Sequence, residues 1–307
     1  MHSVASDRFM EARQPVFIIG SPRSGTSLLR LILTSHSQIV IPPECGFIVW
    51  LYREYKNWTA KDAVDDRLRG QFLIDLYACR KFDTWALDRA ELNSLIINQQ
   101  PSDYATLCAL IYEAYAASQS RSVAVWGDKN NFHVNHLSTL SEIYPDARFL
   151  HLVRDGRDVA CSYREVMKQN SMSPYAPQLP TDIESIADEW LTNVRKVDNY
   201  LSGLHGSKKR TVRYEDLVRQ PESVISNICI WLGLVFEPKM LEFYDRNKRD
   251  QLEPSLTMDW KQRTMEPVSA GTVGRFRTLL TVDELESFNR VAGDMLSRFG
   301  YAGKHLS

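Results

Sequence analysis

A glycine-containing loop between a short apolar run and a second apolar segment is the first feature of the chain that could do chemistry. Residues 16–19 read Val-Phe-Ile-Ile and lead directly into Gly-Ser-Pro-Arg-Ser-Gly-Thr-Ser at 20–27, which is followed by a leucine-rich run with the character of a buried helix. Such a loop turns backbone N–H groups and the positive end of a helix toward one point, where phosphate or sulfate oxygens bind. The loop therefore predicts an anion site, and a purely structural turn between strand and helix is the alternative.

The spacing of this loop fits the template G-x-x-x-x-G-K-[ST] of kinases and nucleotide triphosphatases, with one departure. Thr26 occupies the position of the lysine. Because that lysine acts on the β- and γ-phosphates together with a magnesium ion, its absence argues against nucleotide triphosphate chemistry. Arg23 is the residue of the loop that could supply the missing charge. A P-loop-type kinase and a nucleotide-binding module without turnover stay open as alternative functions.

A second candidate anion site lies at 149–162, which reads Phe-Leu-His-Leu-Val-Arg-Asp-Gly-Arg-Asp-Val-Ala-Cys-Ser. Arg154 follows a strand-like run, and Asp155 can cap a helix that carries Ser162 on its flank two turns later. An arginine at the carboxyl end of a strand and a serine on the following helix can bind one dianion. The alternative is an Asp-Gly turn with a surface salt bridge between Arg154 or Arg157 and Asp158.

Short apolar runs alternate with segments of helical period along the chain, which is the pattern of a parallel sheet covered by helices. We expect an α/β fold of the three-layer, P-loop-like kind, with a mostly parallel central sheet and helices on both faces. Thr281 and Glu284 form a capping box ahead of the last helix. Two stretches, 171–181 and 247–271, lack periodicity and are expected to be loops. The expected strands are 16–19, 39–41, 123–126, 149–153 and 211–214.

The amino-acid composition does not indicate a particular class of binding partner. The 307 residues are 44% hydrophobic, and 37 Lys and Arg balance 38 Asp and Glu, so bulk charge does not favour nucleic acid or an anionic membrane. The five cysteines are widely spaced and contain no CxxC pair, which favours a reducing compartment over a disulfide framework or zinc site. No signal-peptide core and no run of membrane-spanning length is seen. We expect a cytoplasmic protein without a membrane span.

The segment at 22–27 resembles the 5′-phosphosulfate loop of sulfotransferases that use 3′-phosphoadenosine 5′-phosphosulfate (PAPS), a P-loop-like family whose loop lacks the Walker lysine. Residues 149–162 are similar to the family's 3′-phosphate element. The two elements occur here in the family's order. The resemblance implies that Arg154 and Ser162 bind the adenosine 3′-phosphate, and that the 5′-phosphosulfate is held by Arg23, Ser24, Gly25, Thr26 and Ser27.

Three further segments look like the tyrosylprotein sulfotransferase branch and its bacterial relatives, so the resemblance extends over almost the whole chain. Trp-Gly-Asp-Lys at 126–129 implies that Lys129 lies beside the phosphosulfate, and Val-Arg-Tyr-Glu-Asp-Leu at 212–217 implies that Tyr214 lies near the cofactor. The segment from 266 to 276 resembles a closing loop whose basic residue, Arg275, reaches the cofactor. Glu266 departs from this pattern, because the branch more often has lysine there. We expect a single sulfotransferase domain at 15–303 after an N-terminal extension at 1–14.

An acceptor hydroxyl needs a group that takes its proton, because a protonated alcohol or phenol is a weak nucleophile. Glu44 follows Ile-Val-Ile-Pro-Pro at 39–43, and it matches the glutamate proposed as the base in the tyrosylprotein branch. A glutamate at a helix N-terminus without a chemical role is the alternative. His133 is the second candidate base, since the small cytosolic branch uses a histidine.

By analogy with phosphoryl transfer, the resemblance implies that Arg23 and Lys129 neutralise charge on the leaving phosphate and sulfuryl oxygens while Glu44 takes the proton. PAPS is consumed as co-substrate, 3′-phosphoadenosine 5′-phosphate (PAP) is released, and no metal is expected because arginine and lysine take its place. We expect a small-molecule, saccharide, lipid or carrier-bound hydroxyl rather than a peptidyl tyrosine, because tyrosylprotein enzymes need a secretory signal or anchor. The sequence indicates neither the acceptor's identity nor the oligomeric state.

Overall fold

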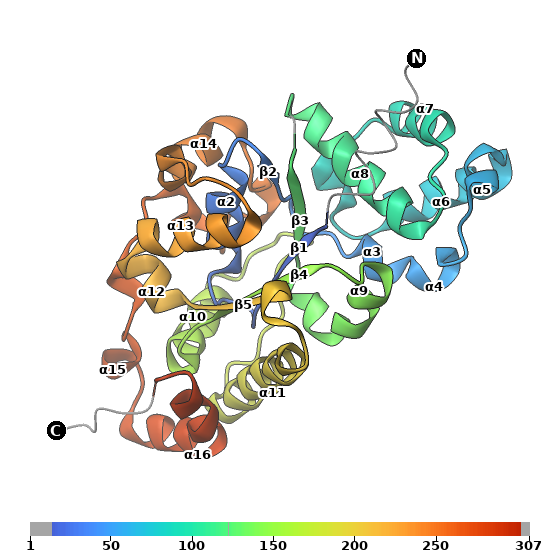
Figure 1. Ribbon diagram of the computed structural model, residues 1–307. Coiled ribbons are helices and arrows are strands. Elements are labelled where there is room, and N and C mark those ends of the chain that lie inside the picture. The colour runs from blue at the N-terminus through green and yellow to red at the C-terminus, as the bar shows by residue number, and fades with distance from the viewer. Residues whose placement is uncertain (1–13, 122, 302–307) are drawn as a thin grey trace. The chain divides into compact units, whose positions relative to one another are not determined.

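The five strands of the protein form one sheet in the order β2-β3-β1-β4-β5 (Figure 1). They are β1 (Val16–Ile19), β2 (Ile39–Val40), β3 (Val125–Lys129), β4 (Arg148–Val153) and β5 (Lys209–Arg213). The computed structural model describes residues 14–121 and 123–301, so the predicted extension at 1–14 lies outside the described residues except for its last position. β2 is parallel to β3, and β4 is parallel to β5. The predicted α/β class with a mostly parallel sheet is confirmed.

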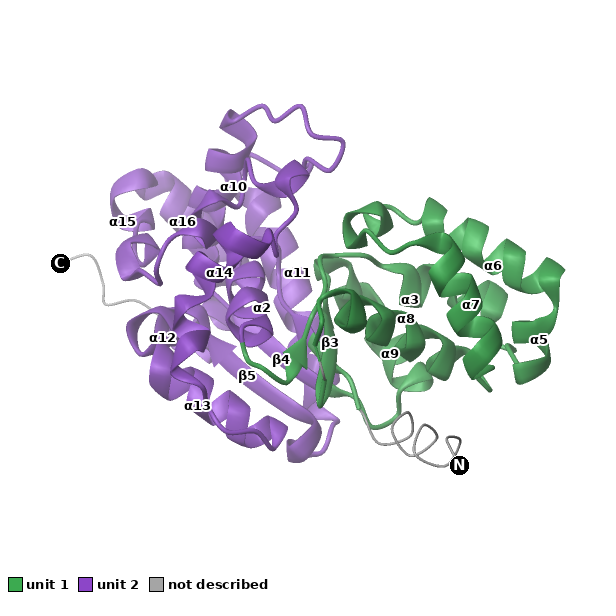
Figure 2. Ribbon diagram, turned by 90° about the horizontal axis from the view of Figure 1, so that it is seen from above, with its two compact units in different colours: residues 1–17, 36–148 green, residues 18–35, 149–307 purple. Residues whose placement is uncertain are grey.

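The chain divides into two compact units, and the boundary between them passes through β1. Unit 1 comprises residues 1–17 and 36–148, and unit 2 comprises residues 18–35 and 149–307 (Figure 2). The single domain expected at 15–303 stays a prediction. Each unit is described below by itself.

Unit 1 places β2 and β3 beside an aromatic core. The ring centroid of Tyr112 lies 4.4 Å from that of Trp126 and 5.0 Å from that of Trp85. These rings are large and almost fully buried. Trp85 also donates a hydrogen bond to the carbonyl of Pro43, in the segment that follows β2. The helices of this unit are α3 (Phe47–Trp50), α4 (Tyr52–Tyr55), α5 (Ala60–Val64), α6 (Asp66–Ala78), α7 (Arg89–Gln99), α8 (Tyr104–Ser118) and α9 (Leu137–Ile143), with 3₁₀ turns η1 (Phe82–Trp85) and η2 (Asn131–Asn135).

Unit 2 has helices on both sides of β4 and β5. Its helices are α2 (Thr26–Thr34), α10 (Gly156–Lys168), α11 (Ile183–Ser202), α12 (Tyr214–Arg219), α13 (Pro221–Leu232), α14 (Phe243–Asp250), α15 (Phe276–Leu279) and α16 (Val282–Arg298), with 3₁₀ turns η3 (Gly206–Lys208), η4 (Pro238–Glu242), η5 (Ser255–Thr257), η6 (Gln262–Met265) and η7 (Ala270–Thr272). Figure 1 shows α12 and α13 on one side of these strands and α10 and α11 on the other. The capping box predicted at Thr281 and Glu284 is confirmed at the start of α16.

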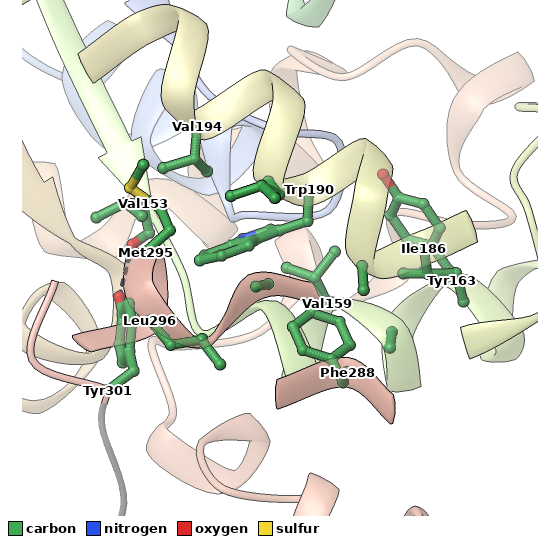
Figure 3. Packing of buried hydrophobic residues seen from close by; sticks show 14 residues of the cluster. Val153, Val159, Tyr163, Ile186, Trp190, Val194, Phe288, Met295, Leu296 and Tyr301 are labelled. Carbon is green, nitrogen blue, oxygen red and sulfur yellow. Dashed lines mark hydrogen bonds between the residues drawn. The ribbon is translucent and has the colours of Figure 1, made fainter. Parts of the chain in front are cut away.

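The core between α10, α11 and α16 fixes the carboxyl end of β4 (Figure 3). Trp190 is fully buried there, and its Nε1 donates a hydrogen bond of 3.0 Å to the carbonyl of Arg154. A Cβ on Gly156 would lie 2.6 Å from the Phe288 ring and 2.7 Å from the Trp190 ring, so only glycine fits at this position. The turn that carries Arg154 is therefore held by the core on its inner side.

Some predicted boundaries were wrong. The strand predicted at 123–126 is instead Val125–Lys129. It continues through Gly127 because glycine has no Cβ, and a Cβ at this position would lie 2.4 Å from the carbonyl oxygen of Val16. The strand predicted at 211–214 ends at Arg213, and Tyr214 begins α12, whose first turn carries two acidic residues that favour a helix N-terminus. The predicted loop at 247–271 contains the end of α14 and the short turns η5, η6 and η7. Single 3₁₀ turns are too short to show a helical period.

Candidate functional site

The loop at 20–27 has the geometry of an anion-binding turn. Gly25 has a φ of 96°, and a Cβ there would lie 2.5 Å from the Tyr214 ring, so glycine is required by conformation and by space. α2 follows directly, and within the described part of the chain its N-terminal residue Gly25 makes no side-chain capping hydrogen bond. The hydroxyl of Ser24 is fully buried and has no hydrogen-bond partner among the residues that the structure describes. A helix N-terminus with a buried unsatisfied hydroxyl suits an oxyanion.

Arg23, Arg154 and Ser162 come together in unit 2. Arg23 Nε donates to Ser162 Oγ at 3.1 Å, and Arg154 Nη1 donates to the carbonyl oxygen of Arg23 at 3.1 Å. Arg154 is only 7% exposed, and its Nε has no hydrogen-bond partner within residues 14–121 and 123–301. Arg154 thus lies directly after the carboxyl end of β4 and keeps one buried N–H donor that a bound anion could accept from.

Tyr214 joins this cluster because β4 and β5 are parallel neighbours. Val153 is paired with Arg213, so the residues that follow them, Arg154 and Tyr214, emerge at the same edge. The Arg154 guanidinium lies 4.6 Å from the Tyr214 ring centroid, at a distance typical of a cation–π contact. Thr272 connects to both residues: its carbonyl accepts from Arg154 Nη2 at 3.0 Å, and its hydroxyl lies 2.8 Å from the Tyr214 hydroxyl.

The segment at 272–276 is fastened to α10. Asp158 accepts hydrogen bonds from the backbone N–H groups of Gly274 and Phe276, at 2.7 and 3.1 Å. Arg275 pairs with Glu165, about two helical turns after Asp158 on α10, and this hydrogen bond lowers the pKa of the Glu165 carboxyl. Burial raises the pKa of Asp158. Arg275 thus has an acidic partner on α10, while Thr272, the first residue after the predicted loop at 247–271, contacts Arg154.

Glu44 and Lys129 come together in unit 1. Lys129, the last residue of β3, is almost fully buried, and its Nζ donates to Glu44 Oε1. The other carboxylate oxygen, Oε2, accepts from Lys81 Nζ at 2.6 Å. β2 and β3 are parallel, with Val40 opposite Trp126, so the residues that follow both strands lie at the same edge. A carboxylate whose two oxygens each bind an ammonium group is firmly oriented.

His133 lies in the core of unit 1. Its side chain is fully buried, its Nε2 is 3.2 Å from Asp128 Oδ1, and its ring makes an edge contact with Phe17 at a centroid distance of 5.9 Å. Asp128 also accepts a hydrogen bond from the buried Tyr112 hydroxyl. The surroundings of His133 are those of a packed core histidine.

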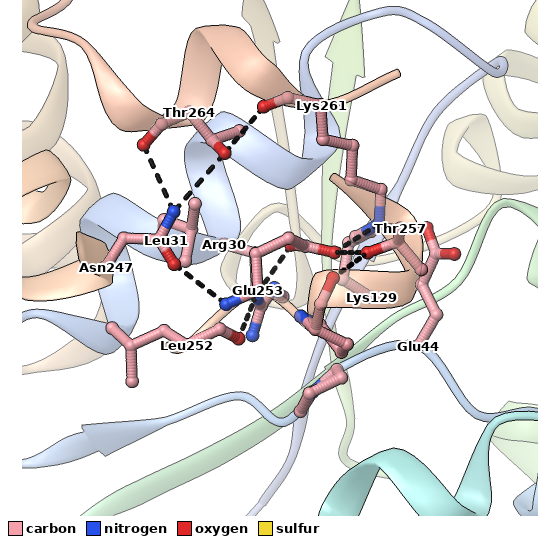
Figure 4. A network of polar contacts seen from close by, with 12 residues as sticks. Arg30, Leu31, Glu44, Lys129, Asn247, Leu252, Glu253, Thr257, Lys261 and Thr264 are labelled. Carbon is pink, nitrogen blue, oxygen red and sulfur yellow. Dashed lines mark hydrogen bonds and ion pairs between the residues drawn. The ribbon is translucent and has the colours of Figure 1, made fainter. Parts of the chain in front are cut away.

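Unit 2 contains a buried ionic network around Glu253 (Figure 4). Arg30, on α2, donates to Glu253 Oε2 at 2.8 Å and to the carbonyl of Leu252 at 2.7 Å. Lys261 pairs with the other oxygen, Oε1, which also accepts from Thr257 Oγ1 at 3.0 Å. The network connects the segment at 252–261 to α2, the helix that follows the loop at 20–27, because Arg30 lies one turn from the start of α2.

Sequence reasoning missed Lys81, Thr272 and Glu253. Lys81 follows α6 with a left-handed φ of 72°, a conformation that no local pattern indicates for lysine. Glu253 lies in the stretch 247–271 that was predicted to be a loop without periodicity, and Thr272 follows directly after it. No motif marked these residues, since each acts through a contact with a distant part of its own unit.

No group of three or more His, Cys, Asp or Glu side chains within residues 14–121 and 123–301 is placed to hold a metal ion. In the same part of the chain, no helix combines the length and the apolar composition needed to cross a membrane.

Comparison with known proteins gives a family match over most of the chain. The model of the Sulfotransferase family matches residues 15–238. The nodulation protein NoeE of Sinorhizobium fredii is 27% identical over 300 residues, which cover 93% of this chain and 65% of that protein. A putative protein-tyrosine sulfotransferase of Caenorhabditis briggsae is 26% identical over 232 residues, which cover 76% of this chain and 70% of that protein. The chain thus spans about two thirds of the length of these curated relatives.

Solved structures show the same fold. The sulfotransferase domain of the Synechococcus PCC 7002 olefin synthase superposes with a TM-score of 0.56 at 24% identity, over 91% of this chain and 96% of that domain. The sulfotransferase domain from the curacin biosynthetic pathway gives a TM-score of 0.55 at 20% identity, over 94% of this chain and 98% of that domain. At these identities the likeness concerns the fold.

Proposed function

Because the chain belongs to the sulfotransferase family and is an enzyme of that kind, we propose that it moves the sulfuryl group of PAPS to a hydroxyl of an acceptor and releases PAP. One observation carries the proposal: the Arg23 side chain binds Ser162 while its carbonyl binds Arg154. The groups assigned to the 5′-phosphosulfate and to the 3′-phosphate are thereby joined in one largely buried cluster. A P-loop-type kinase would need the lysine that Thr26 replaces.

The residues of unit 2 fit an anionic co-substrate. Ser24 Oγ and Arg154 Nε are buried donors without a hydrogen-bond partner among the described residues, and oxygens of a phosphosulfate and a 3′-phosphate would satisfy them. In this proposal Arg23 and the backbone of Ser24 to Ser27 hold the 5′ end. Arg154 and Ser162 hold the 3′-phosphate, Tyr214 lies beside the bound nucleotide, and Arg275 closes over it.

The proposed reaction needs one bond to form and one to break. The acceptor oxygen attacks sulfur, the bond between sulfur and the 5′-phosphate oxygen breaks, and the acceptor proton passes to Glu44. Arg23 and Lys129 neutralise the charge that grows on the leaving phosphate and the sulfuryl oxygens, which is how proteins assist loose transition states of this type. No metal has a part in this scheme.

Two observations support Glu44 over His133 as the base. Glu44 is bound by lysine ammonium groups, and a carboxylate paired with cations is in the form that accepts a proton. Its side chain is 15% exposed, so an acceptor can approach it, whereas the His133 side chain is fully buried. A base must come within hydrogen-bond reach of the hydroxyl that it deprotonates.

For the acceptor, we propose a small molecule, saccharide, lipid or carrier-bound chain with a hydroxyl, in preference to peptidyl tyrosine. A cytoplasmic location is part of the same proposal. Of the aromatic side chains that the sequence offers for an acceptor site, Tyr55 and Trp58 pack in the core, while Trp50 is 39% exposed and close to Glu44 in the chain.

Ligand binding and turnover test the proposal together. PAP should raise the melting temperature, and ATP with magnesium should do so far less, because only a ligand that binds the folded state stabilises it. Incubation with sulfur-labelled PAPS and a pooled hydroxyl library, followed by mass spectrometry, should then yield a sulfated product and PAP. Stabilisation by ATP with magnesium alone would support a kinase, and PAP binding without transfer to any acceptor would support a binding module.

A further inference from the structure

The side chain of the proposed base, Glu44, and the carbonyl of the residue before it are held by the same short turn of unit 1. This turn, residues 81–85, begins at Lys81 and contains η1. Lys81 Nζ donates to Glu44 Oε2 at 2.6 Å, and Trp85 Nε1 donates to the carbonyl oxygen of Pro43 at 2.9 Å. Two adjacent residues, Pro43 and Glu44, are thus bound from both ends of the 81–85 turn.

The 81–85 turn has a defined conformation, which aims Lys81 at one place. Lys81 and Ala86 flank η1 with left-handed φ values of 72° and 51°. The carbonyl of Lys81 accepts from both the backbone N–H and the hydroxyl of Thr84, at 3.1 and 2.7 Å. Non-glycine residues keep a left-handed conformation only where the surroundings determine it, and they concentrate at functional sites.

Aromatic packing supplies those surroundings. Phe82 and Trp85 are almost fully buried. Phe47, three residues after Glu44, lies 5.9 Å from the Phe82 ring and 5.7 Å from the Trp85 ring. The Trp85 ring also lies 5.0 Å from that of Tyr112. The chain on both sides of Glu44 is therefore packed against the turn that carries Lys81.

The two lysines at Glu44 differ in what else the proposed reaction asks of them. Lys129 binds Oε1 and is also assigned to the leaving group, whereas Lys81 binds Oε2 and has no role toward PAPS in the scheme. Charge-assisted hydrogen bonds from two directions hold a carboxylate in one plane. In the proposed scheme, Lys81 therefore acts only through its contact with Glu44.

We propose that Lys81 is a positioning residue that holds the Glu44 carboxylate in the orientation needed to take the acceptor proton. The inference rests on the proposed function, since it requires Glu44 to be the base. Misplacing a catalytic group by about 1 Å costs on the order of 100-fold in rate. Lys81→Met should therefore lower kcat by about 10- to 100-fold, with PAP affinity and acceptor KM nearly unchanged, and Lys81→Arg should restore a large part of the activity.

A double-mutant cycle with Glu44→Gln tests this assignment. The assay uses labelled PAPS and the hydroxyl compound selected from the library, and Lys56→Met, an exposed lysine of the same unit, serves as the matched control. Adding Lys81→Met to Glu44→Gln should cost less than about 3-fold, because an amide without base function gains nothing from being oriented.

The other possible results distinguish a failure of the Lys81 proposal from a failure of the proposed function. Equal losses in the wild-type and Glu44→Gln backgrounds, with a lowered melting temperature, would make Lys81 a structural residue and overturn the proposal. A raised acceptor KM with unchanged kcat would make it an acceptor contact and also overturn it. If the wild-type protein and Lys56→Met transfer no sulfuryl group, the proposed function fails instead, and this is seen before any Lys81 variant is compared.

Discussion

Arg23 donates its Nε–H to the hydroxyl of Ser162 across 139 positions of sequence, at 3.1 Å. The contact joins the loop before α2 to the flank of α10. Arg154 completes the connection by donating to the Arg23 carbonyl. Hydrogen bonds within unit 2 therefore connect the residues proposed for the 5′-phosphosulfate with those proposed for the 3′-phosphate. A substitution in one of the two groups should alter ligand binding by the other.

The first prediction concerns Arg154 and the 3′-phosphate. Arg154→Ala should weaken PAP binding by about 2 to 5 kcal/mol, the cost of removing one partner from a buried, hydrogen-bonded charge pair. Binding of adenosine 5′-phosphate, which lacks the 3′-phosphate, should weaken much less. Isothermal titration calorimetry measures both affinities, with Arg195→Ala, an exposed arginine on α11, as control. Equal losses for the two ligands would remove Arg154 from the 3′-phosphate role.

The second prediction concerns Lys129, whose charge is of most use as the leaving group departs. Lys129→Ala should lower kcat by about 10²- to 10³-fold, which is the range for removing one donor that stabilises developing charge. Lys129→Arg keeps the charge and should lose less. Steady-state kinetics with labelled PAPS separate kcat from KM, and a change in KM alone would make Lys129 a binding residue.

The third prediction concerns the buried network around Glu253. Glu253→Gln leaves Arg30 and Lys261 buried without a carboxylate between them, so the free energy of unfolding should fall by about 3 to 5 kcal/mol. Urea unfolding measures this loss. Glu286→Gln, on the exposed face of α16, is the matched control and should have little effect. A loss below about 1 kcal/mol would show that the network does not stabilise the segment at 252–261.

Arg154 and Ser162 could be predicted from sequence because local geometry fixes them. They lie eight positions apart in one strand–turn–helix segment. The end of β4 and the Asp155 cap of α10 determine where the two side chains are placed. The loop between β1 and α2 was predictable for the same reason, and its role as an anion site stays a prediction. Parallel strand order is not readable from the sequence, so the contact of Arg154 with Tyr214 required the structure.

Lys81 shows why the rest could not be predicted. Its contact with Glu44 spans 37 positions and depends on a left-handed backbone that lysine rarely adopts. Residue propensity and hydrophobic periodicity predict helices and strands. They do not predict a turn whose conformation is fixed by the packing of Phe82 and Trp85. The same limit applies to Thr272, which lies in a short 3₁₀ turn.

The last prediction concerns Glu44 as the general base. Glu44→Gln keeps the size and part of the hydrogen bonding of the side chain but removes the proton acceptor, so PAP affinity should stay nearly unchanged. Turnover should fall by about 10²- to 10⁴-fold, the usual contribution of general base catalysis. The acidic limb of the pH–rate profile should vanish, because that limb reports protonation of the base.

The choice of acceptor separates a lost base from lost geometry. An acceptor with a more acidic hydroxyl should be affected less by Glu44→Gln, because its proton leaves with less help. Kinetics with a series of phenols of graded acidity, in wild type and variant, measure this difference. If Glu44 only stabilised a helix N-terminus, turnover would change little and stability would shift by about 1 kcal/mol or less. That result, together with loss of activity in His133→Ala, would assign the base to His133.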